Sequence, residues 1–370
     1  MNEGKFNKKS KIRILVSPLN WGLGHASRCI PIIKELLAND CEVMVAAERE
    51  CMRLIKKEFP QINYLSLPAY DISYTKKGSQ LKWKLLLQLP FIANTIYKEH
   101  KWLKKTIRSN NIAAVISDNR FGLHTTKIPS VYITHQLLIK TGSSFWDKFF
   151  QRRHYSIIKK YSKCWVPDES ENGIAGELSH PVLLPANIQY IGPISRLEKA
   201  GKDILYDILI IMSGPEPQRT ILEEILLQQI INIDKRIVLV RGSENADTIG
   251  LKPNIIKILH QANARELNEL ILQSEVVISR CGYSTVMDLI KLQKKAILIP
   301  TPGQTEQEYL AEKLMKEGVF YCAEQDKLIL KDALKYIKEN SFSFPEYNWE
   351  GYKDAVREFV REIAEKRKVN

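Results

Sequence analysis

The sequence lacks the signals of several common protein classes. Its six cysteines never stand at Cys-x-x-Cys spacing, which argues against a zinc site or a dithiol redox pair and favours a reducing compartment. It has no run of 18 uninterrupted apolar residues, so we expect no membrane-spanning helix. An Asp-x-Asp pair, a common metal signature beside phosphates, is also missing. Low-complexity segments are absent, and the 44% apolar composition of the 370 residues is that of a globular protein.

Strand-like and helical segments alternate along the chain. The basic start before residues 12–19 is like a secretory signal, but Arg13 interrupts the apolar stretch, so a first strand is the better interpretation. We expect strands at 12–17, 42–46, 64–67, 113–117, 130–134, 164–166, 204–212, 236–240, 255–258, 275–279 and 296–299. Helices between them imply an α/β fold with parallel sheets. We predict domains at 1–187 and 188–344, with a linker near 188–193 and a final helix within 345–370.

The segment Ser-Arg-Cys-Gly-Tyr-Ser-Thr at 279–285 is the most informative part of the chain. It follows a predicted strand and opens a helix, so free backbone N–H groups and the helix dipole can hold a phosphate there. Asp288, one turn further on, is suited to ribose hydroxyls. The loop after the next strand brings more polar side chains to the same sheet edge, where α/β folds bind ligands. The predicted donor-binding residues of these two loops are Gly282, Ser284, Thr285, Asp288, Gln304, Glu306 and Gln307.

These two loops resemble the nucleotide-sugar half of GT-B glycosyltransferases, most closely the MurG family of UDP-GlcNAc transferases. The resemblance covers roughly the last 150 residues, with both motifs in the right order. An ordinary βαβ unit with Ser/Thr caps is the alternative, but capping does not require the second loop. The resemblance implies two Rossmann-like, doubly wound domains facing across a cleft. It also implies that the final helix packs back on the N-terminal domain.

The loop after the first strand, Asn-Trp-Gly-Leu-Gly-His-Ala-Ser-Arg at 20–28, has two glycines but Ser27 where a dinucleotide fingerprint needs a third. It is similar to the acceptor-side Gly-His loop of the MurG and UDP-glucosyltransferase families. By that resemblance His25 is the candidate general base; a purely structural histidine is the alternative. Gly22, Gly24 and Arg28 are predicted to line the acceptor side.

Asp118 ends a short predicted strand on the same edge of the sheet as His25. Plant-type glucosyltransferases resemble this arrangement, with an Asp that orients their loop histidine, so Asp118 is the predicted partner of His25. A helix N-cap, or a pair with Arg28 or Arg120, is the alternative. Arg120, His135 and Gln136 are further candidates for the acceptor side.

The remaining donor-side candidates follow the first strands of the second half. MurG relatives carry a Gly-Gly-Ser-x-Gly loop near the pyrophosphate, of which only Ser213 and Gly214 are kept here. Three arginines are candidates to supply the missing phosphate contacts, namely Arg219, Arg241 and Arg280. Without an Asp-x-Asp pair we expect no metal ion and no cofactor beyond a UDP-sugar co-substrate.

The net charge of +13 is concentrated in two segments, 74–108 and 145–163, where lysines and arginines alternate with aromatic residues. Basic aromatic helices suit an anionic membrane surface. A plain solvated surface is the second interpretation, and a nucleic-acid surface is disfavoured because no such motif is present. We expect a cytoplasmic protein bound peripherally to the inner face of the membrane.

Together these features predict an inverting, metal-independent transferase that moves a sugar from a UDP-sugar to a lipid-linked or cell-envelope glycan acceptor. The resemblance implies that the sugar is GlcNAc. A hydrolase is the main alternative, because PseG has a Gly-x-Gly-His-x-x-Arg run that resembles residues 22–28. A nonhydrolysing UDP-GlcNAc 2-epimerase shares the architecture, but its acid/base set is not found. A non-catalytic subunit that binds nucleotide sugars is the third alternative.

Overall fold

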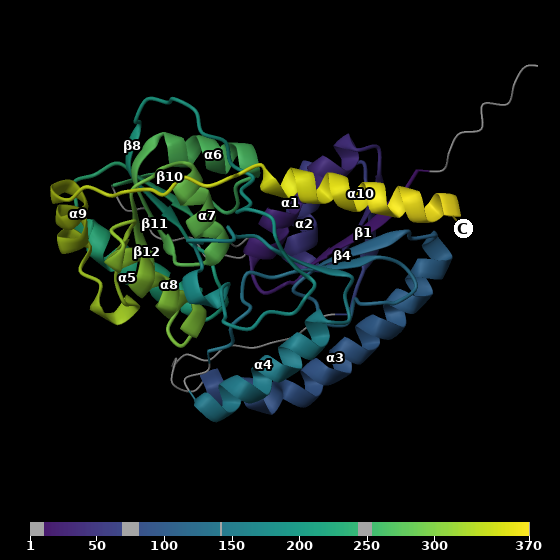
Figure 1. Cartoon of the computed structure of the whole chain (residues 1–370). Helices are drawn as coiled ribbons and strands as arrows, with labels where there is room; N and C mark the ends of the chain where they lie inside the picture. The colour runs from purple at the N-terminus through teal and green to yellow at the C-terminus, as the bar shows by residue number, and fades with distance from the viewer. Residues whose placement is uncertain (1–10, 69–80, 141–142, 243–253, 370) are drawn as a thin grey trace, which may run out of the picture.

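The computed structural model describes residues 11–68, 81–140, 143–242 and 254–369. These form two parallel sheets, each with helices on both faces (Figure 1). Residues 74–80, the start of the first basic segment, lie outside the described residues. Within the described ranges, no helix combines the length and apolar character needed to cross a membrane.

The first sheet has the order β3-β2-β1-β4-β5-β6-β7, with every pairing parallel. Its strands are β1 (Arg13–Pro18), β2 (Glu42–Ala47), β3 (Asn63–Ser66), β4 (Ala114–Asp118), β5 (Ser130–Ile133), β6 (Lys163–Val166) and β7 (Ile188–Tyr190). The part of the chain predicted as a linker therefore begins as an edge strand. Because β1 and β4 pair in register, Pro18 lies opposite Asp118 and both strands end at one edge.

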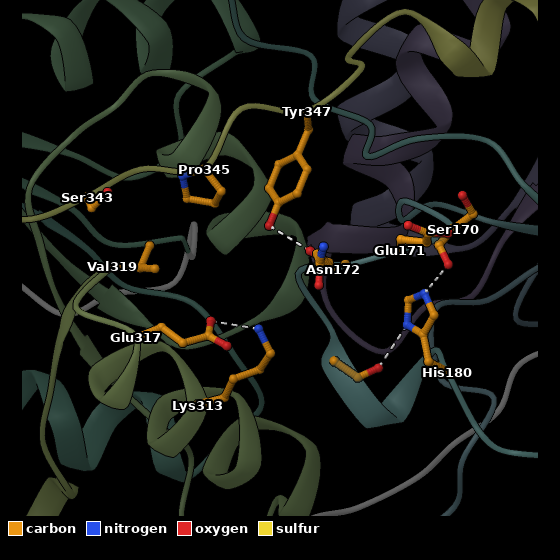
Figure 2. A pocket seen from close by; sticks show the side chains of 12 residues that line it. Ser170, Glu171, Asn172, His180, Lys313, Glu317, Val319, Ser343, Pro345 and Tyr347 are labelled. Carbon is orange, nitrogen blue, oxygen red and sulfur yellow. Dashed lines mark hydrogen bonds and ion pairs between the residues drawn. The ribbon is translucent and has the colours of Figure 1, made fainter.

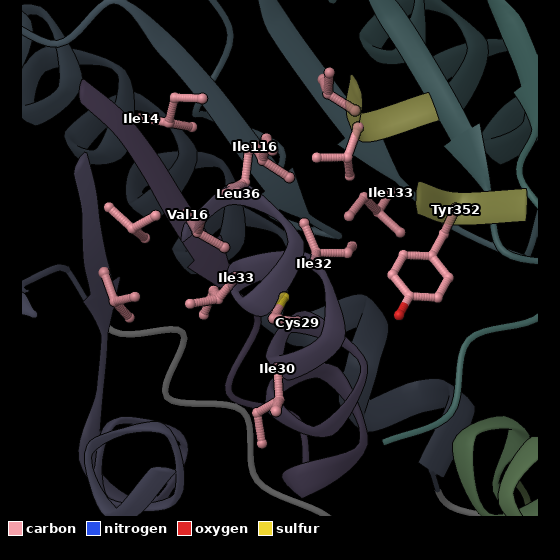
Figure 3. Close-up of a cluster of buried hydrophobic side chains, with 14 of the residues drawn as sticks. Ile14, Val16, Cys29, Ile30, Ile32, Ile33, Leu36, Ile116, Ile133 and Tyr352 are labelled. Carbon is pink, nitrogen blue, oxygen red and sulfur yellow. The ribbon is translucent and has the colours of Figure 1, made fainter. Parts of the chain in front are cut away.

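Helices cover the two faces of this sheet. Alternate strand residues such as Ile14 and Val16 face α1 (Leu23–Ala38) and α2 (Arg49–Glu58), whereas Leu15 faces α3 (Leu81–Asn110). Figure 3 shows the first of these cores, where α1 packs on the strands. The described part of the first basic segment, 81–108, lies in the single helix α3. The other basic segment forms α4 (Ser144–Ile158), on the same face as α3.

The second sheet has the order β10-β9-β8-β11-β12-β13. Its strands are β8 (Tyr206–Ile211), β9 (Ile237–Val240), β10 (Ile255–Leu259), β11 (Ser274–Arg280), β12 (Ala296–Ile299) and β13 (Tyr321–Cys322). One face carries α6 (Ala264–Leu272), α7 (Tyr283–Lys291) and α8 (Thr305–Lys316), and the other carries α5 (Gln218–Gln229) and α9 (Leu330–Glu339). This reproduces the strand–turn–helix arrangement predicted for residues 275–310.

Each half of the chain contributes one segment to the hydrophobic core of the other half. The last helix, α10 (Gly351–Val369), lies against α1, and its Tyr352 and Phe359 belong to the first core (Figures 1 and 3). In the opposite direction, Ile174, Ala175 and Leu178 leave the first sheet after β6 and pack into the core of the second sheet. The two halves are thus interlocked at both crossings.

Candidate active site

The polar residues of the first loop meet at the carboxyl edge of β1 and β4. Gly22 caps α1 with a φ of 105°, a backbone conformation that glycine adopts readily, and His25 lies in the first turn. His25 Nδ1 is 2.8 Å from Asp118 Oδ1, so the predicted contact is present. Arg28, one turn further along α1, donates from Nε to Asp118 Oδ2 at 2.5 Å and from Nη2 to Oδ1. The two alternatives for Asp118 are therefore combined, because it accepts from both His25 and Arg28.

The electrostatics of this cluster favour a neutral imidazole beside an ionised carboxylate. Burial lowers the pKa of His25 below its usual 6.5, Asp118 opposes this, and Arg28 adds to the lowering. Burial alone would raise the pKa of Asp118, but Arg28 and His25 outweigh it and bring the value to about 2. A neutral His25 oriented by a carboxylate has the form that a general base requires.

Arg120 is a correction to the predicted acceptor side. Its side chain is fully buried, with Nε donating to Glu99 at 2.6 Å and Nη2 to Glu48 at 2.7 Å. Glu99 comes from α3 and Glu48 precedes α2. A fully buried guanidinium held by two carboxylates has a structural role in linking these elements.

His135 follows β5 and reaches across to the second half. Its Nε2 is 2.9 Å from Glu306 Oε1 in the first turn of α8, and its ring stacks on Tyr283 with centroids 4.0 Å apart and planes 3° from parallel. Its Nδ1 lies 3.3 Å from Arg28 Nη1. Gln136, next in the chain, is half-buried beside it. His135 and Glu306, predicted to contact different substrates, therefore contact each other.

The N-terminus of α7 faces the first loop directly. Gly282 is its N-cap, and Ser284 and Thr285 lie half-buried in its first turn. Ser284 Oγ donates to the carbonyl of Gly24 at 3.1 Å. A Cβ atom on Gly24 would lie 3.0 Å from Ser284 Oγ, so the contact leaves little room for a side chain. The helix end predicted to bind phosphate and the loop that carries His25 are thus in direct contact between the two halves.

Asp288 faces the segment that follows β7 and connects the two halves. It is buried and accepts from Ser195 Oγ at 2.5 Å, and burial raises its pKa to about 6, with Arg196 and Ser195 acting in the opposite sense. Arg196 is a residue that the sequence interpretation missed. Among the described residues its Nε and Nη1 are buried without a hydrogen-bond partner. An arginine in an otherwise apolar linker, three residues after Pro193, was the available signal.

The loop before α8 is held by its own glutamines. Gln307 Oε1 accepts from the backbone of Thr301 at 2.9 Å, and its Nε2 donates to Gln304 Oε1 at 2.5 Å. These bonds fix the loop that presents Glu306. Gln304 and Gln307 therefore shape the predicted donor loop, whereas Glu306 contacts His135 of the first half.

The three arginines predicted to bind donor phosphate are engaged within the second half. Arg219 pairs with Glu216, and buried Arg241 donates to Glu223 at 2.7 Å. Arg280 is buried and donates to backbone oxygens of Pro300 and Gln218. Each guanidinium therefore has partners inside the second half, and donor binding by the three arginines stays a prediction.

The Ser213–Gly214 turn after β8 lies at the same sheet edge as the other donor loops. Gly214 has a φ of 96°, and a Cβ there would lie 3.9 Å from Thr301 Oγ1. The hydroxyl of Thr301 is buried and has no hydrogen-bond partner among the described residues. This turn therefore borders a buried polar position at the edge where the donor was predicted to bind.

A hollow of about 770 Å³ lies away from these residues (Figure 2). Its walls come from the loop after β6, the second half of α8 and the strand-free segment before α10, and include His180, Lys313 and Tyr347. Lys313 is paired with Glu317 at 2.7 Å, and His180 contacts the backbone. Within the described ranges, His, Cys, Asp and Glu side chains form no group of three or more that could hold a metal ion.

Comparison with known proteins gives matches over both halves. Residues 217–365 match the model of the glycosyltransferase family 28 C-terminal domain. An uncharacterized glycosyltransferase of Methanosarcina acetivorans is 21% identical over 331 residues, 83% of this chain and 84% of that protein. The UDP-N-acetylglucosamine--N-acetylmuramyl-(pentapeptide) pyrophosphoryl-undecaprenol N-acetylglucosamine transferase of Prochlorococcus marinus is 31% identical over 140 residues, 36% of this chain and 38% of that protein.

Solved structures share the architecture. The glycosyltransferase of kitacinnamycin superposes with a TM-score of 0.61 at 12% identity, covering 95% of each chain. MurG of Acinetobacter baumannii gives 0.54 at 13% identity, over 95% of this chain and 99% of that one. The GT-B fold predicted from the sequence is confirmed.

Proposed function

We propose that this chain, a glycosyltransferase with the GT-B fold and a family 28 C-terminal domain, moves a sugar from a UDP-sugar to a lipid-linked or glycan acceptor. The transfer inverts the anomeric centre and needs no metal ion. The observation that carries the proposal is the His25–Asp118 pair, which faces the N-terminus of α7 across the Gly24–Ser284 contact. The proposed base and the helix end proposed to bind phosphate thus lie next to each other where the two halves meet.

The proposed chemistry is a single displacement. Asp118 accepts the Nδ1–H of His25, so Nε2 keeps its lone pair and takes the proton of the acceptor hydroxyl. The acceptor oxygen forms its bond to the anomeric carbon as the bond from that carbon to the phosphate oxygen breaks. UDP leaves with the bonding electron pair, and the attack from the opposite face inverts the configuration.

Groups of the protein can stabilise the departing diphosphate. The free amides at the start of α7 lie beside the loop that carries His25, and Ser284 adds a hydroxyl. Arg196 brings a buried guanidinium with unpaired nitrogens close to Asp288, the residue proposed to bind the ribose. These donors support the proposal that neither a metal ion nor a further cofactor takes part.

The donor assignment rests on similarity. The relative from Prochlorococcus marinus is named for a UDP-N-acetylglucosamine donor and an undecaprenol-linked acceptor, and its matched length of 140 residues is 36% of this chain. We therefore propose UDP-GlcNAc as the first donor to test and an undecaprenyl-type lipid as the first acceptor.

The acceptor proposal includes contact with an anionic membrane on the cytoplasmic side. Phe91 and Tyr97 on α3 are 74% and 67% exposed, and Phe145 on α4 is 72% exposed. Exposed cations such as Lys98 and Arg152 lie on the same two helices. Exposed aromatic rings among cations favour the interface of an anionic bilayer, where each cation contributes about 1 kcal/mol.

The test is UDP release by the purified chain from a panel of UDP-sugars, with and without a membrane lipid extract, beside His25→Ala. The proposal expects release that depends on lipid and is lost in the variant. Flotation with vesicles of phosphatidylcholine alone or with phosphatidylserine tests the surface, with Phe91→Ser/Phe145→Ser as the weakened variant. Equal flotation of variant and wild type would contradict the membrane part.

A hydrolase is the second candidate, and Arg28 is the observation that favours it. Arg28 is the last residue of the Gly-x-Gly-His-x-x-Arg run, and its guanidinium contacts Asp118 inside the site. In a hydrolase, water replaces the acceptor hydroxyl and His25 remains the base. Equal UDP release with and without lipid, together with free sugar as product, would establish this reaction instead.

A further inference from the structure

We propose that the loop 181–185, between β6 and β7, inserts its aliphatic tip into the anionic bilayer that α4 is proposed to contact. The inference rests on the proposed membrane contact and adds to it an element from another part of the fold. The loop has the sequence Pro-Val-Leu-Leu-Pro. Val182 is 100% exposed, Leu183 78% and Leu184 44%, whereas Pro185 is buried.

Three consecutive aliphatic side chains on a surface loop call for an apolar partner. Single exposed apolar residues are common on protein surfaces, but a continuous exposed run is typical of an interaction site. The proline at each end of the loop fixes its φ angle and restricts the backbone, so the tip cannot readily fold back onto the protein. The hydrophobic effect favours moving this tip out of water.

Hydrogen bonds fix the loop beside α4. The hydroxyl of Tyr155, on α4, donates to the carbonyl of Leu183 at 2.7 Å. Beyond the tip, Asn187 Nδ2 donates to the carbonyls of Ile158 and Tyr161, at 2.9 and 3.0 Å, where α4 ends. The bond to the carbonyl of Leu183 also satisfies a polar group that would otherwise oppose transfer into lipid. The tip therefore has a fixed position beside α4.

The surroundings of the tip match an anionic bilayer. Arg152 and Lys159 stand three residues before and four residues after Tyr155, on its side of the helix, and both are exposed. The same helix carries the exposed rings of Phe145 and Phe149. An aliphatic tip flanked by cations fits apolar chains beneath a negatively charged surface. A second copy of this chain would instead bring the same positive charges against its own.

The loop is also joined to the predicted acceptor side. Leu178, three residues before the loop, accepts from the backbone N–H of Leu137 at 2.6 Å. Gln151 of α4 bonds to the same segment, with Nε2 donating to the carbonyl of Leu137 at 2.6 Å. This segment follows His135, a predicted acceptor contact, by two residues. Insertion of the tip therefore holds the predicted acceptor side at the membrane, the source of a lipid-linked acceptor.

The experiment places a fluorescent probe on the tip of the full chain. Val182→Cys is labelled with the environment-sensitive fluorophore NBD, and wild type gives the background labelling of its own cysteines. The matched control is Ile329→Cys, which replaces an aliphatic residue of the second half that is 59% exposed. Vesicles of phosphatidylcholine alone or with phosphatidylserine are added to each protein. Flotation with the same vesicles compares wild type, Val182→Ser/Leu183→Ser and Ile329→Ser.

We expect NBD emission at position 182 to brighten and shift to the blue with phosphatidylserine vesicles, and the label at 329 to stay as in water. Val182→Ser/Leu183→Ser should bind these vesicles about 10-fold or more weakly, and Ile329→Ser as wild type does. A label at 182 that stays in water while wild type floats overturns the inference. An NBD change that depends on protein concentration without vesicles also overturns it, because a second copy then covers the tip.

The inference and the proposed function fail separately. If Phe91→Ser/Phe145→Ser floats as wild type does while Val182→Ser/Leu183→Ser is weakened, the contact through the two helices is refuted and the loop is supported. Failure of wild type to bind either kind of vesicle overturns both membrane contacts. UDP release measured with lipid dissolved in detergent needs no bilayer, so its absence beside an inserted tip refutes the proposed transfer alone.

Discussion

At the scale of single residues, burial sets the chemistry of His25. Its ring is largely desolvated, which disfavours the imidazolium, and the neighbouring Arg28 disfavours it further. Asp118 supplies the opposing attraction and orients the ring. The imidazole of His25 therefore loses its proton at a lower pH than an ordinary histidine does.

This environment predicts the acid limb of the pH profile. In wild type the midpoint of kcat/KM on the acid side falls below 6.5, because that is the direction in which the pKa of His25 is displaced. Asp118→Asn removes the charge that supports the imidazolium, so the limb moves further toward acid and kcat falls by roughly 100-fold or more. Steady-state UDP formation across pH measures both. Exposed Asp203→Asn is the control, and a limb above 6.5 in wild type would refute the argument.

Asp288 gives a stability prediction with a defined sign. Its pKa is raised from 3.8 to about 6, so the folded protein binds this proton more tightly than the unfolded chain does. The stabilisation is full below pH 3.8 and is lost as the pH rises through about 6.

Asp288→Asn cannot ionise and escapes that loss. We expect its free energy of unfolding, relative to wild type, to rise by about 3 kcal/mol between acid and neutral pH. Urea unfolding at several pH values measures the difference, with exposed Asp234→Asn as control. A pH-independent difference would show that Asp288 ionises normally in the folded protein.

Residue contacts were predictable from the sequence only where topology dictates them. His25 and Asp118 follow neighbouring parallel strands, whose carboxyl ends must meet, so their proximity could be inferred. The partners of Arg120 and Arg280 come from α3, α5 and loops distant in sequence. No local pattern specifies such pairs, and both arginines were assigned to ligands for that reason.

At the scale of elements, α3 is bound to the loop that follows Asp118 by one buried carboxylate. Glu99 Oε1 accepts from Arg120, and its Oε2 accepts the backbone N–H of Gly122 at 3.0 Å. A Cβ on Gly122 would lie 2.4 Å from the carbonyl of Ile96, so only glycine lets the loop approach the helix this closely. The proposed membrane helix and Asp118 are therefore parts of one rigid unit.

Removing the Glu99 carboxylate should loosen that unit. Glu99→Ala removes one of the two described carboxylates that hold the buried guanidinium of Arg120, and it removes the described acceptor of the N–H of Gly122. We expect a loss of about 3–5 kcal/mol in the free energy of unfolding, measured by urea titration. Exposed Lys98→Ala, the preceding residue, should change it by less than about 0.5 kcal/mol. Equal effects of the two substitutions would contradict the buried tie.

The element pattern was predicted well where strands are long and apolar. The edge strands β7 and β13, with three and two residues, were missed. Segments this short are defined by their neighbours in the sheet and not by their own periodicity.

At the scale of the whole molecule, α10 fastens the end of the chain to its beginning. Phe359 is fully buried and contacts Trp165 edge to face, with ring centroids 5.6 Å apart. Arg357 adds an ion pair to Glu35 of α1 at 2.9 Å. The resemblance to GT-B enzymes predicted this packing, and the structure has it.

The anchoring role of α10 is measurable. Phe359→Ala removes a buried ring and leaves a cavity between α10 and the first sheet, so we expect a loss of about 3–5 kcal/mol. Arg361→Ala, exposed on the same helix, is the control and should be near neutral. Urea unfolding of both variants tests this. A small loss for Phe359→Ala would mean that the helix adds little to the first core.

The interlocked crossings limit how this enzyme can be recombined with its relatives. A chimera cut in the linker near residue 188 would carry Ile174, Ala175 and Leu178 with the wrong half, and the incoming half would lack their three apolar side chains. It would also transplant α10 away from the helix on which it packs. The exchangeable module is discontinuous in sequence: the second sheet together with the loop after β6, but without α10. Laboratory shuffling of acceptor and donor halves should respect that discontinuous boundary.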